Sequence, residues 1–151
     1  MTNLTANDRA LLNIIQSDFP LTARPFEAIA RRLGTTEEDV LKRLRRLKDD
    51  HIIRRVGGNF SPEKLGFVST LCAARVPEEK IDAFAAAVNR YPGVTHNYQR
   101  DNRFNIWFTF IAPSMDEIQG HLDEIAAETG VDKIVNLPAT HVFKIKAQFD
   151  L

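Results

Sequence analysis

The sequence predicts an α+β fold in two parts, a winged helix-turn-helix at residues 1–62 and a βαββαβ domain at residues 63–151. Three observations support this prediction. Apolar residues recur at helical spacing in three successive segments of the first part. Two of those segments are joined by a short turn that contains Gly34, as in helix-turn-helix motifs. In the second part, strand-like and helix-like segments alternate in the ferredoxin-like order β-α-β-β-α-β.

Composition excludes several classes of protein. The 20 Lys and Arg residues balance the 20 Asp and Glu residues, and the apolar share of 44% is typical of a globular protein. No apolar run approaches the roughly 18 residues of a membrane span, and the polar start predicts no signal peptide. We therefore expect a cytoplasmic protein that does not bind membranes. The single cysteine, Cys72, excludes an internal disulfide and a multi-cysteine metal site within one chain.

The first two helices have clear start and stop signals. Thr5 or Asn7 can cap the first, and Pro20 ends it, because a residue before proline disfavours helical backbone. The second is expected over residues 25–33, and Gly34 ends it. After the third helix, residues 51–60 predict a short β-hairpin, the wing, which turns at the Gly-Gly pair.

The third helix, capped by Thr35 or Thr36, combines basic and acidic residues. It opens with three acids, where a DNA-recognition helix presents residues to base edges. Residues 1–66 contain 12 basic and 9 acidic residues, and residues 67–151 contain 8 and 11, so no strong basic excess exists. A DNA-recognition helix and a solvated basic face are both open interpretations, and the acids favour the second. The basic residues are Lys42, Arg43, Arg45, Arg46 and Lys48, and the acids are Glu37, Glu38 and Asp39.

The second part predicts a four-stranded sheet with two helices on one face. The helices begin at Pro77 and Ser114. The opposite face has no cover within the chain, so a partner subunit is expected there. The predicted strands are 68–76, 94–100, 104–111 and a last strand from 134–137 and 142–149 with a break at Pro138.

Candidate site residues stand out in both parts. Side chains alternate along a strand, so His96, Tyr98 and Arg100 share one face, and Trp107 lies on the neighbouring strand. This row predicts a ligand site, the alternative being a solvated face. In the wing, the pair at 54–55 is either two exposed arginines or a clamp for a phosphate or carboxylate.

Several chemistries lack their motifs. His51, His121 and His141 are scattered, and no His or Glu pair has metal-ligand spacing, so we expect no metal site made by the protein. The Gly-Gly pair at 57–58 lacks the surroundings of a phosphate-binding loop. No serine nucleophile motif occurs either.

The architecture and motifs resemble a known family. A winged helix-turn-helix joined to a βαββαβ domain resembles the Lrp/AsnC family of transcription regulators over essentially the whole chain. Within that group, IRRVGG at 53–58, KLGF at 64–67, YPGVTHNYQR at 91–100 and NIWF at 105–108 resemble the sirohaem (siroheme) decarboxylases of haem biosynthesis. Val56 replaces a more usual Phe, and Gly58 a more usual Ala.

The resemblance implies a decarboxylase that removes the acetate carboxylates of sirohaem to give 12,18-didecarboxysirohaem. It implies a heterodimer with a paralogous subunit and no cofactor beyond the iron that arrives with the substrate. His96 is then the expected general acid and Tyr98 a second donor, while Arg54, Arg55 and Arg100 would hold carboxylates. Trp107 would pack on the macrocycle or fill the core.

Other interpretations remain open at this point. His96 could instead bind the iron as an axial ligand, giving a haem-binding chain without its own chemistry. The alternative function is a Lrp/AsnC-type transcription regulator that binds DNA and a small effector.

Overall fold

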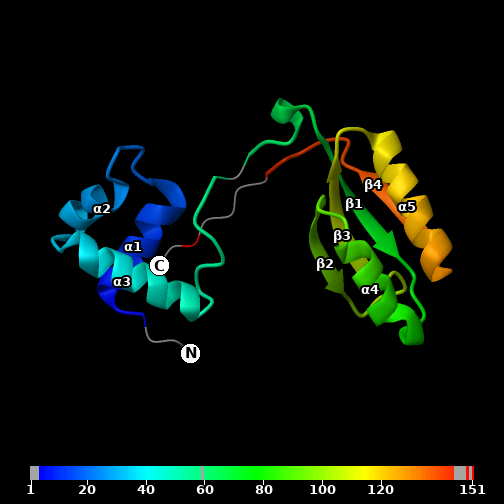
Figure 1. The fold of residues 1–151 in the computed structure, drawn as a ribbon, viewed down its shortest axis with the longest axis horizontal. Coiled ribbons are helices and arrows are strands. Elements are labelled where there is room, and N and C mark those ends of the chain that lie inside the picture. The colour runs from blue at the N-terminus through cyan, green and yellow to red at the C-terminus, as the bar shows by residue number, and fades with distance from the viewer. Residues whose placement is uncertain (1–3, 59, 145–148, 150) are drawn as a thin grey trace. The chain divides into compact units, whose positions relative to one another are not determined.

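The computed structural model describes residues 4–58, 60–144, 149 and 151, and its elements follow the predicted order (Figure 1). It contains two compact units, Met1–Gly58 with Lys144–Leu151 and Asn59–Phe143. They are called the N-terminal and C-terminal units below. The predicted boundary fell between residues 62 and 63. Within the described residues, no helix is long and apolar enough to cross a membrane.

The N-terminal unit contains three helices, α1 (Ala6–Ser17), α2 (Pro25–Leu33) and α3 (Glu37–Asp49). Thr5 caps α1, and its hydroxyl accepts a hydrogen bond from the Asp8 N–H while the Asp8 carboxylate accepts one from the Thr5 N–H. Gly34 ends α2 at a φ of 65°, in the left-handed region that glycine adopts without strain. These signals confirm the predicted helices. The fully or nearly fully buried core residues are Leu11, Leu12, Ile29, Ala30, Val40, Leu44, Leu47 and Ile53.

The predicted wing hairpin is wrong for the residues that the structure describes. Neither 51–58 nor Phe60 forms a strand there. Instead, the N–H groups of Ile52 and Ile53 both donate hydrogen bonds to the carbonyl of Leu47, near the C-terminal end of α3. A two-stranded hairpin is marginal by itself, and glycines disfavour strands.

The C-terminal unit is a four-stranded antiparallel sheet in the order β2-β3-β1-β4, with helices α4 and α5 on one face (Figure 1). This confirms the predicted fold class. The predicted last strand ends early, because Val142–Lys144 form no strand, and the positions predicted at 145–148 lie outside the described residues. The elements are η1 (Glu63–Leu65), β1 (Val68–Ala74), η2 (Glu78–Lys80), α4 (Ile81–Asn89), β2 (Val94–Gln99), β3 (Ile106–Ala112), α5 (Met115–Thr129) and β4 (Ile134–Pro138).

The core of this unit lies between the sheet and its helices. On β3, Ile106, Phe108 and Phe110 are buried against α4 and α5, whereas the residues between them are only half-buried. Gly93, just before β2, allows close strand approach, because a Cβ there would lie 2.0 Å from the carbonyl oxygen of Ile111. The alternation leaves a second face of the sheet that no helix of this unit's described residues covers, and we call it the open face.

Candidate functional site

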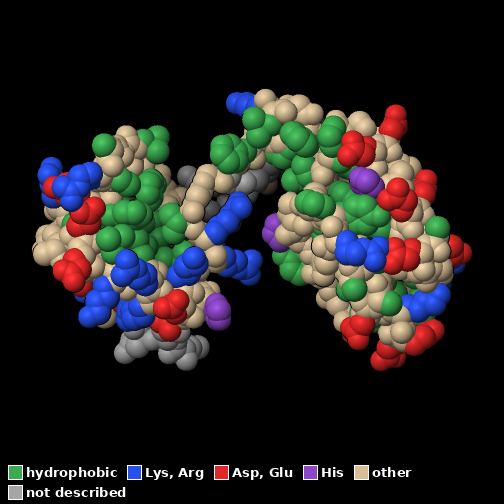
Figure 2. Space-filling view, viewed as in Figure 1, with side chains coloured by type: hydrophobic (Ala, Val, Ile, Leu, Met, Phe, Trp, Pro, Cys, Tyr) green, Lys and Arg blue, Asp and Glu red, His purple; other side chains and the backbone are tan. Residues whose placement is uncertain are grey.

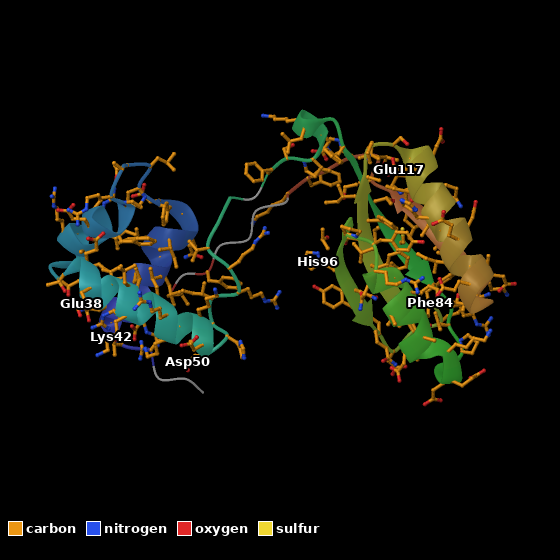
Figure 3. All side chains as sticks on the ribbon, in the orientation of Figure 1. Glu38, Lys42, Asp50, Phe84, His96 and Glu117 are labelled. Carbon is orange, nitrogen blue, oxygen red and sulfur yellow. The ribbon has the colours of Figure 1, made fainter. Side chains whose placement is uncertain are left out.

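The open face carries the predicted row of side chains. In the pairing of β2 with β3, His96 lies opposite Thr109 and Tyr98 opposite Trp107. Directly opposed residues project to the same side of a sheet. The intervening Asn97 lies opposite the buried Phe108, and therefore faces the helices. Figure 3 shows His96 on the side of β2 turned away from α4. The prediction that His96 and Tyr98 share one face is confirmed.

Ring packing orders these side chains. The rings of His96 and Tyr98 stack with centroids 5.9 Å apart and an interplanar angle of 25°. Thr95, at an irregularity in the pairing of β2, places its Oγ1 3.0 Å from Nδ1 of His96. Within the described part of the chain, Nε2 is therefore the ring nitrogen left open to a ligand.

Arg100 completes the row at the end of β2. Its guanidinium carbon lies 5.6 Å from the centroid of the Trp107 ring, which is a cation–π contact. Among the described residues, no carboxylate forms an ion pair with Arg100. Arg100 is exposed, so its fork of N–H donors can receive a carboxylate from a ligand.

The turn between β2 and β3 holds Trp107 and Arg100 in this arrangement. The indole Nε1–H of Trp107 donates to the carbonyl of Phe104 at 2.6 Å, and the N–H of Arg100 donates to the carbonyl of Asn105 at 2.8 Å. The Asn105 side chain in turn bonds both main-chain groups of Val76. Our sequence reasoning assigned no role to Asn105, although it lies in the quoted NIWF segment.

The two predicted wing arginines lie in the other unit. Arg54 and Arg55 are exposed and line a cavity of about 810 Å³ in the N-terminal unit. The two compact units thus divide the predicted site: His96, Tyr98, Arg100 and Trp107 share the C-terminal unit, and Arg54 and Arg55 belong to the N-terminal unit. The other walls of the cavity are mostly apolar. They come from Leu4, Leu12, Ile15, Gln16, Phe19, Leu21, Ile52, Ile53, Val56, Gly57, Gly58, Phe149 and Leu151.

Phe149 and Leu151 line this cavity, and side chains of α1 hold them there. Gln16 donates through Nε2 to the carbonyl of Phe149 at 2.6 Å and accepts the Phe149 N–H at 3.1 Å. Asn13 donates to the carbonyl of Leu151 at 3.1 Å. Side-chain amides of α1 therefore fix main-chain groups at residues 149 and 151.

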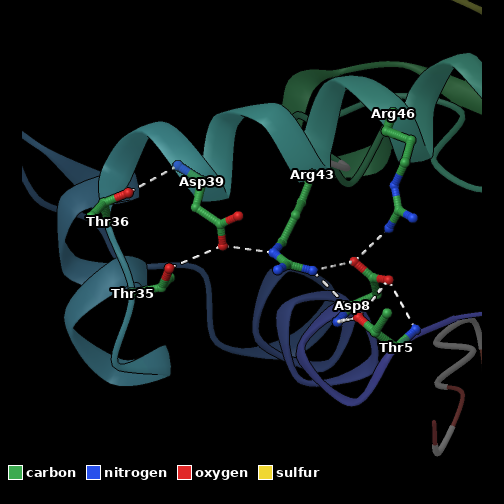
Figure 4. Close-up of polar contacts among 7 residues, drawn as sticks. All are labelled: Thr5, Asp8, Thr35, Thr36, Asp39, Arg43 and Arg46. Carbon is green, nitrogen blue, oxygen red and sulfur yellow. Dashed lines mark hydrogen bonds and ion pairs between the residues drawn. The ribbon is translucent and has the colours of Figure 1, made fainter.

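The basic helix α3 is tied to α1 by a buried acid (Figure 4). Asp8 is fully buried, and its carboxylate lies 3.1 Å from Arg43 and 2.6 Å from Arg46. Burial by itself raises the pKa of Asp8, but hydrogen bonds from Arg46, Thr5 and Arg43 outweigh it and hold the pKa below its ordinary value. Figure 2 shows Lys and Arg side chains near α3 interspersed with Asp and Glu.

A second titratable cluster lies on the helix side of the sheet. His121 stacks on Phe110 with an interplanar angle of 9°, and its Nδ1 lies 3.3 Å from Glu124. Tyr91 donates to the same carboxylate at 2.8 Å. Burial and this bond raise the pKa of Tyr91, whereas the bonds from Tyr91 and His121 lower the pKa of Glu124. No group of three His, Cys, Asp or Glu residues in the described ranges could hold a metal ion.

Comparison with known proteins first gives the class. A family model described as the AsnC-like ligand binding domain matches residues 64–144. A solved AsnC family transcriptional regulator from Agrobacterium tumefaciens has a TM-score of 0.76, with 97% of this chain and 96% of that chain covered. At 19% identity this likeness shows the fold alone. The chain therefore has the Lrp/AsnC-type architecture that its sequence predicted.

Closer relatives give the family. A model described as the siroheme decarboxylase NirDL-like HTH domain matches residues 8–54. The siroheme decarboxylase alpha subunit of Desulfovibrio desulfuricans is 56% identical over 149 residues, which cover 99% of this chain and 86% of the relative. The siroheme decarboxylase NirDL, crystallised with an iron-uroporphyrin III analogue, is 30% identical with a TM-score of 0.66. That match covers 93% of this chain but only 48% of the NirDL chain. The chain belongs to the siroheme decarboxylase family, which confirms the predicted resemblance.

Proposed function

We propose that this chain is a subunit of a sirohaem decarboxylase that removes acetate carboxylates of sirohaem to give 12,18-didecarboxysirohaem. The observation that carries the proposal is the grouping of a histidine, a phenol, an arginine and an indole on the open face. Family membership and the iron-uroporphyrin analogue bound by NirDL support a tetrapyrrole as the ligand.

The reaction breaks the bond between an acetate methylene carbon and its carboxylate. CO₂ leaves without the bonding electron pair, which the conjugated macrocycle of the substrate accepts, so the substrate is its own electron sink. A proton must then reach the methylene carbon to form a methyl group. Because the substrate accepts the electron pair, we propose that the reaction requires no cofactor besides the iron of the substrate.

The open-face residues fit distinct roles in this reaction. The imidazole of His96 has Nε2 open, so it can deliver the proton. The Tyr98 hydroxyl, on the ring stacked against His96, can position the same group or supply a second proton. Arg100 can hold a carboxylate bidentately, and Trp107 offers a flat apolar surface to the macrocycle.

We propose that Arg54 and Arg55, in the N-terminal unit, also bind carboxylates. Sirohaem has several carboxylates around an apolar ring. The mostly apolar cavity bordered by these two guanidiniums has the mixed character that such a molecule requires. We propose that a paralogous second subunit completes the enzyme, as the subunit naming of the D. desulfuricans relative suggests.

The test is anaerobic incubation of sirohaem with the purified chain, alone and with its paralogous partner, followed by mass spectrometry. We expect a loss of two CO₂, with solvent deuterium entering each new methyl group. His96→Ala should lower the rate by about a hundred- to ten-thousand-fold, the usual contribution of a general acid. His121→Ala, a matched histidine on the helix side, should keep the wild-type rate. If wild-type chain and partner leave the sirohaem mass unchanged, the proposal is wrong.

The absorption spectrum of bound sirohaem separates the two roles of His96. As a proton donor, His96 leaves the iron bands unchanged when replaced by Ala, while turnover falls. As an axial iron ligand, it shifts those bands on replacement. We propose the first role, because the stacked phenol of Tyr98 places a second possible proton donor beside the His96 ring.

A further inference from the structure

We propose that Asn105 is a positioning residue, which holds Arg100 and Trp107 where the substrate needs them. The inference takes its substrate, sirohaem, from the proposed function. The contacts of Asn105 that support it do not depend on that function. Asn105 lies half-buried at the turn between β2 and β3, next to the buried Ile106 that begins β3.

The Asn105 side chain takes over where main-chain pairing of β1 with β3 stops. The last pair in that register joins Ala74 to Ile106. Beyond it, Asn105 Nδ2 donates to the carbonyl of Val76 at 2.8 Å, and Asn105 Oδ1 accepts the Val76 N–H at 2.8 Å. The side-chain amide thus bonds Val76 as a peptide group of a neighbouring strand would.

The main chain of Asn105 connects this anchor to the site. Its N–H donates to the carbonyl of Ala74 at 3.0 Å, and its carbonyl accepts the Arg100 N–H at 2.8 Å. The carbonyl of the preceding Phe104 accepts the indole N–H of Trp107. Arg100 and Trp107 are therefore both held by main-chain groups of the turn that the Asn105 side chain fixes to Val76.

The amide of Asn105 satisfies both main-chain groups of Val76, which is only 4% exposed. An alanine would leave a buried N–H and carbonyl without partners. An ionised carboxylate would accept the N–H but would face the carbonyl with no donor. A protonated carboxyl group has both a donor and an acceptor, and so restores the pattern.

The test exploits this chemistry with Asn105→Asp in the full chain, with Asn102→Asp as its matched control. Asn102 is exposed in the same turn, and in the described residues only its main-chain N–H is hydrogen-bonded. Trp107 is the chain's single tryptophan, so its fluorescence reports the turn directly. The emission is compared at about pH 8 and about pH 5, because contact with a carbonyl raises the introduced carboxyl's pKa above its usual value of about 3.9.

We expect Asn105→Asp to shift the emission to longer wavelength at the higher pH and to return toward wild type at the lower pH. Asn102→Asp should follow wild type throughout. The nearby carboxyl groups of Glu78 and Asp101 are present in all three proteins, so the comparison with Asn102→Asp removes any contribution from them. With sirohaem at the higher pH, kcat/KM of Asn105→Asp should fall by about tenfold to 100-fold, since a misplacement of about 1 Å has an effect of this size. Most of that loss should be in KM, because Arg100 and Trp107 bind substrate.

Emission and kcat/KM equal to those of Asn102→Asp would overturn the proposal, as would a loss confined to kcat with unchanged emission. If the wild-type chain does not act on sirohaem, the proposed function is wrong. The pH-dependent emission of Trp107 in Asn105→Asp then still tests whether Asn105 positions the turn. If Asn105→Asp does not fold, hydrogen exchange of the Val76 amide in the wild-type chain tests the contact with Asn105. Slow exchange is expected, and fast exchange contradicts the contact.

Discussion

The arginines of the two units are used in different ways. In the N-terminal unit, Arg43 and Arg46 converge on the fully buried Asp8, so the chain itself satisfies their charge. In the C-terminal unit, Arg100 lies over an indole ring and, among the described residues, has no acidic partner. A cation paired with a buried acid serves the fold, whereas one that faces only an aromatic ring keeps its capacity for a ligand carboxylate.

Other arginines of the N-terminal unit follow the same internal pattern. Arg31 pairs with Glu27 at 2.6 Å and Arg32 with Asp18 at 2.6 Å. Arg24 bridges two acids, one of them on α3. Many arginines of the helix-turn-helix are therefore paired with acids of the same unit. This pairing disfavours binding to DNA, because a phosphate backbone is bound by unpaired cations.

The largest effect that tests this contrast is expected from Arg100→Gln. It removes the charge but keeps a polar side chain of similar reach, so sirohaem loses a charge-assisted partner. We expect kcat/KM to fall on the order of 100-fold, as for truncation of one partner in a hydrogen-bonded charge pair. Urea unfolding followed by Trp107 fluorescence should be unchanged, because Arg100 is exposed.

Arg103→Gln, an exposed arginine in the same turn, is the control and should retain wild-type kcat/KM. Equal losses in the two variants would mean that general positive charge at this edge matters rather than the row on the open face. A large loss of stability in Arg100→Gln would place Arg100 with the structural arginines.

The next effect is expected from Asp8→Asn, which should change stability rather than catalysis. Removing a partner from a fully buried pair costs about 3–5 kcal/mol, and we expect about 2 kcal/mol here because Arg43 and Arg46 can still reach water. Far-UV circular dichroism should report earlier urea unfolding of helix, while Trp107, in the C-terminal unit, should report an unchanged transition.

The pH dependence of this effect has a definite sign. The pKa of Asp8 in the folded chain lies below its ordinary value of 3.8, so its stabilisation is fully present above that pH. It is lost as pH falls through the folded pKa. The difference between wild type and Asp8→Asn should therefore shrink below about pH 4. Asp18→Asn, which disrupts an exposed pair, should match wild type at every pH, and a constant difference for Asp8→Asn would contradict the ion-pair explanation.

Local signals explain how much of the structure could be predicted from the sequence. The cap at Thr5 and the stop at Gly34 act within a few residues, and strand alternation alone put His96 and Tyr98 on one face. For the described residues of 51–60 the predicted wing was wrong, because strand formation depends on pairing that a local Gly-Gly signal does not ensure. A sequence pattern does not reveal the Asn105–Val76 contact either, because it joins residues 29 positions apart.

The acids of α3 show the same limit. Their position at the helix start favoured a solvated basic face over a DNA-recognition helix, and this interpretation stays a prediction. The local pair of Asp39 with Arg43 has helical i,i+4 spacing, but the sequence could not show the long-range pairing of Arg43 with Asp8, which lies 35 positions earlier. Ion pairs between separate helices follow from tertiary packing rather than from spacing.

The smallest effect is expected on the outer side of α3, where Lys42 and Arg45 lie. Lys42→Gln with Arg45→Gln should leave kcat/KM for sirohaem within about twofold, since surface changes away from a site have little effect. The wild-type chain should bind duplex DNA only with the weak affinity of non-specific binding, a Kd of about 10⁻⁴ to 10⁻⁶ M at physiological salt. Fluorescence anisotropy with labelled duplexes across a salt series measures it. A Kd of about 10⁻⁸ M for one sequence, weakened by the double variant, would show that α3 reads DNA and that the N-terminal cations are not mainly internal.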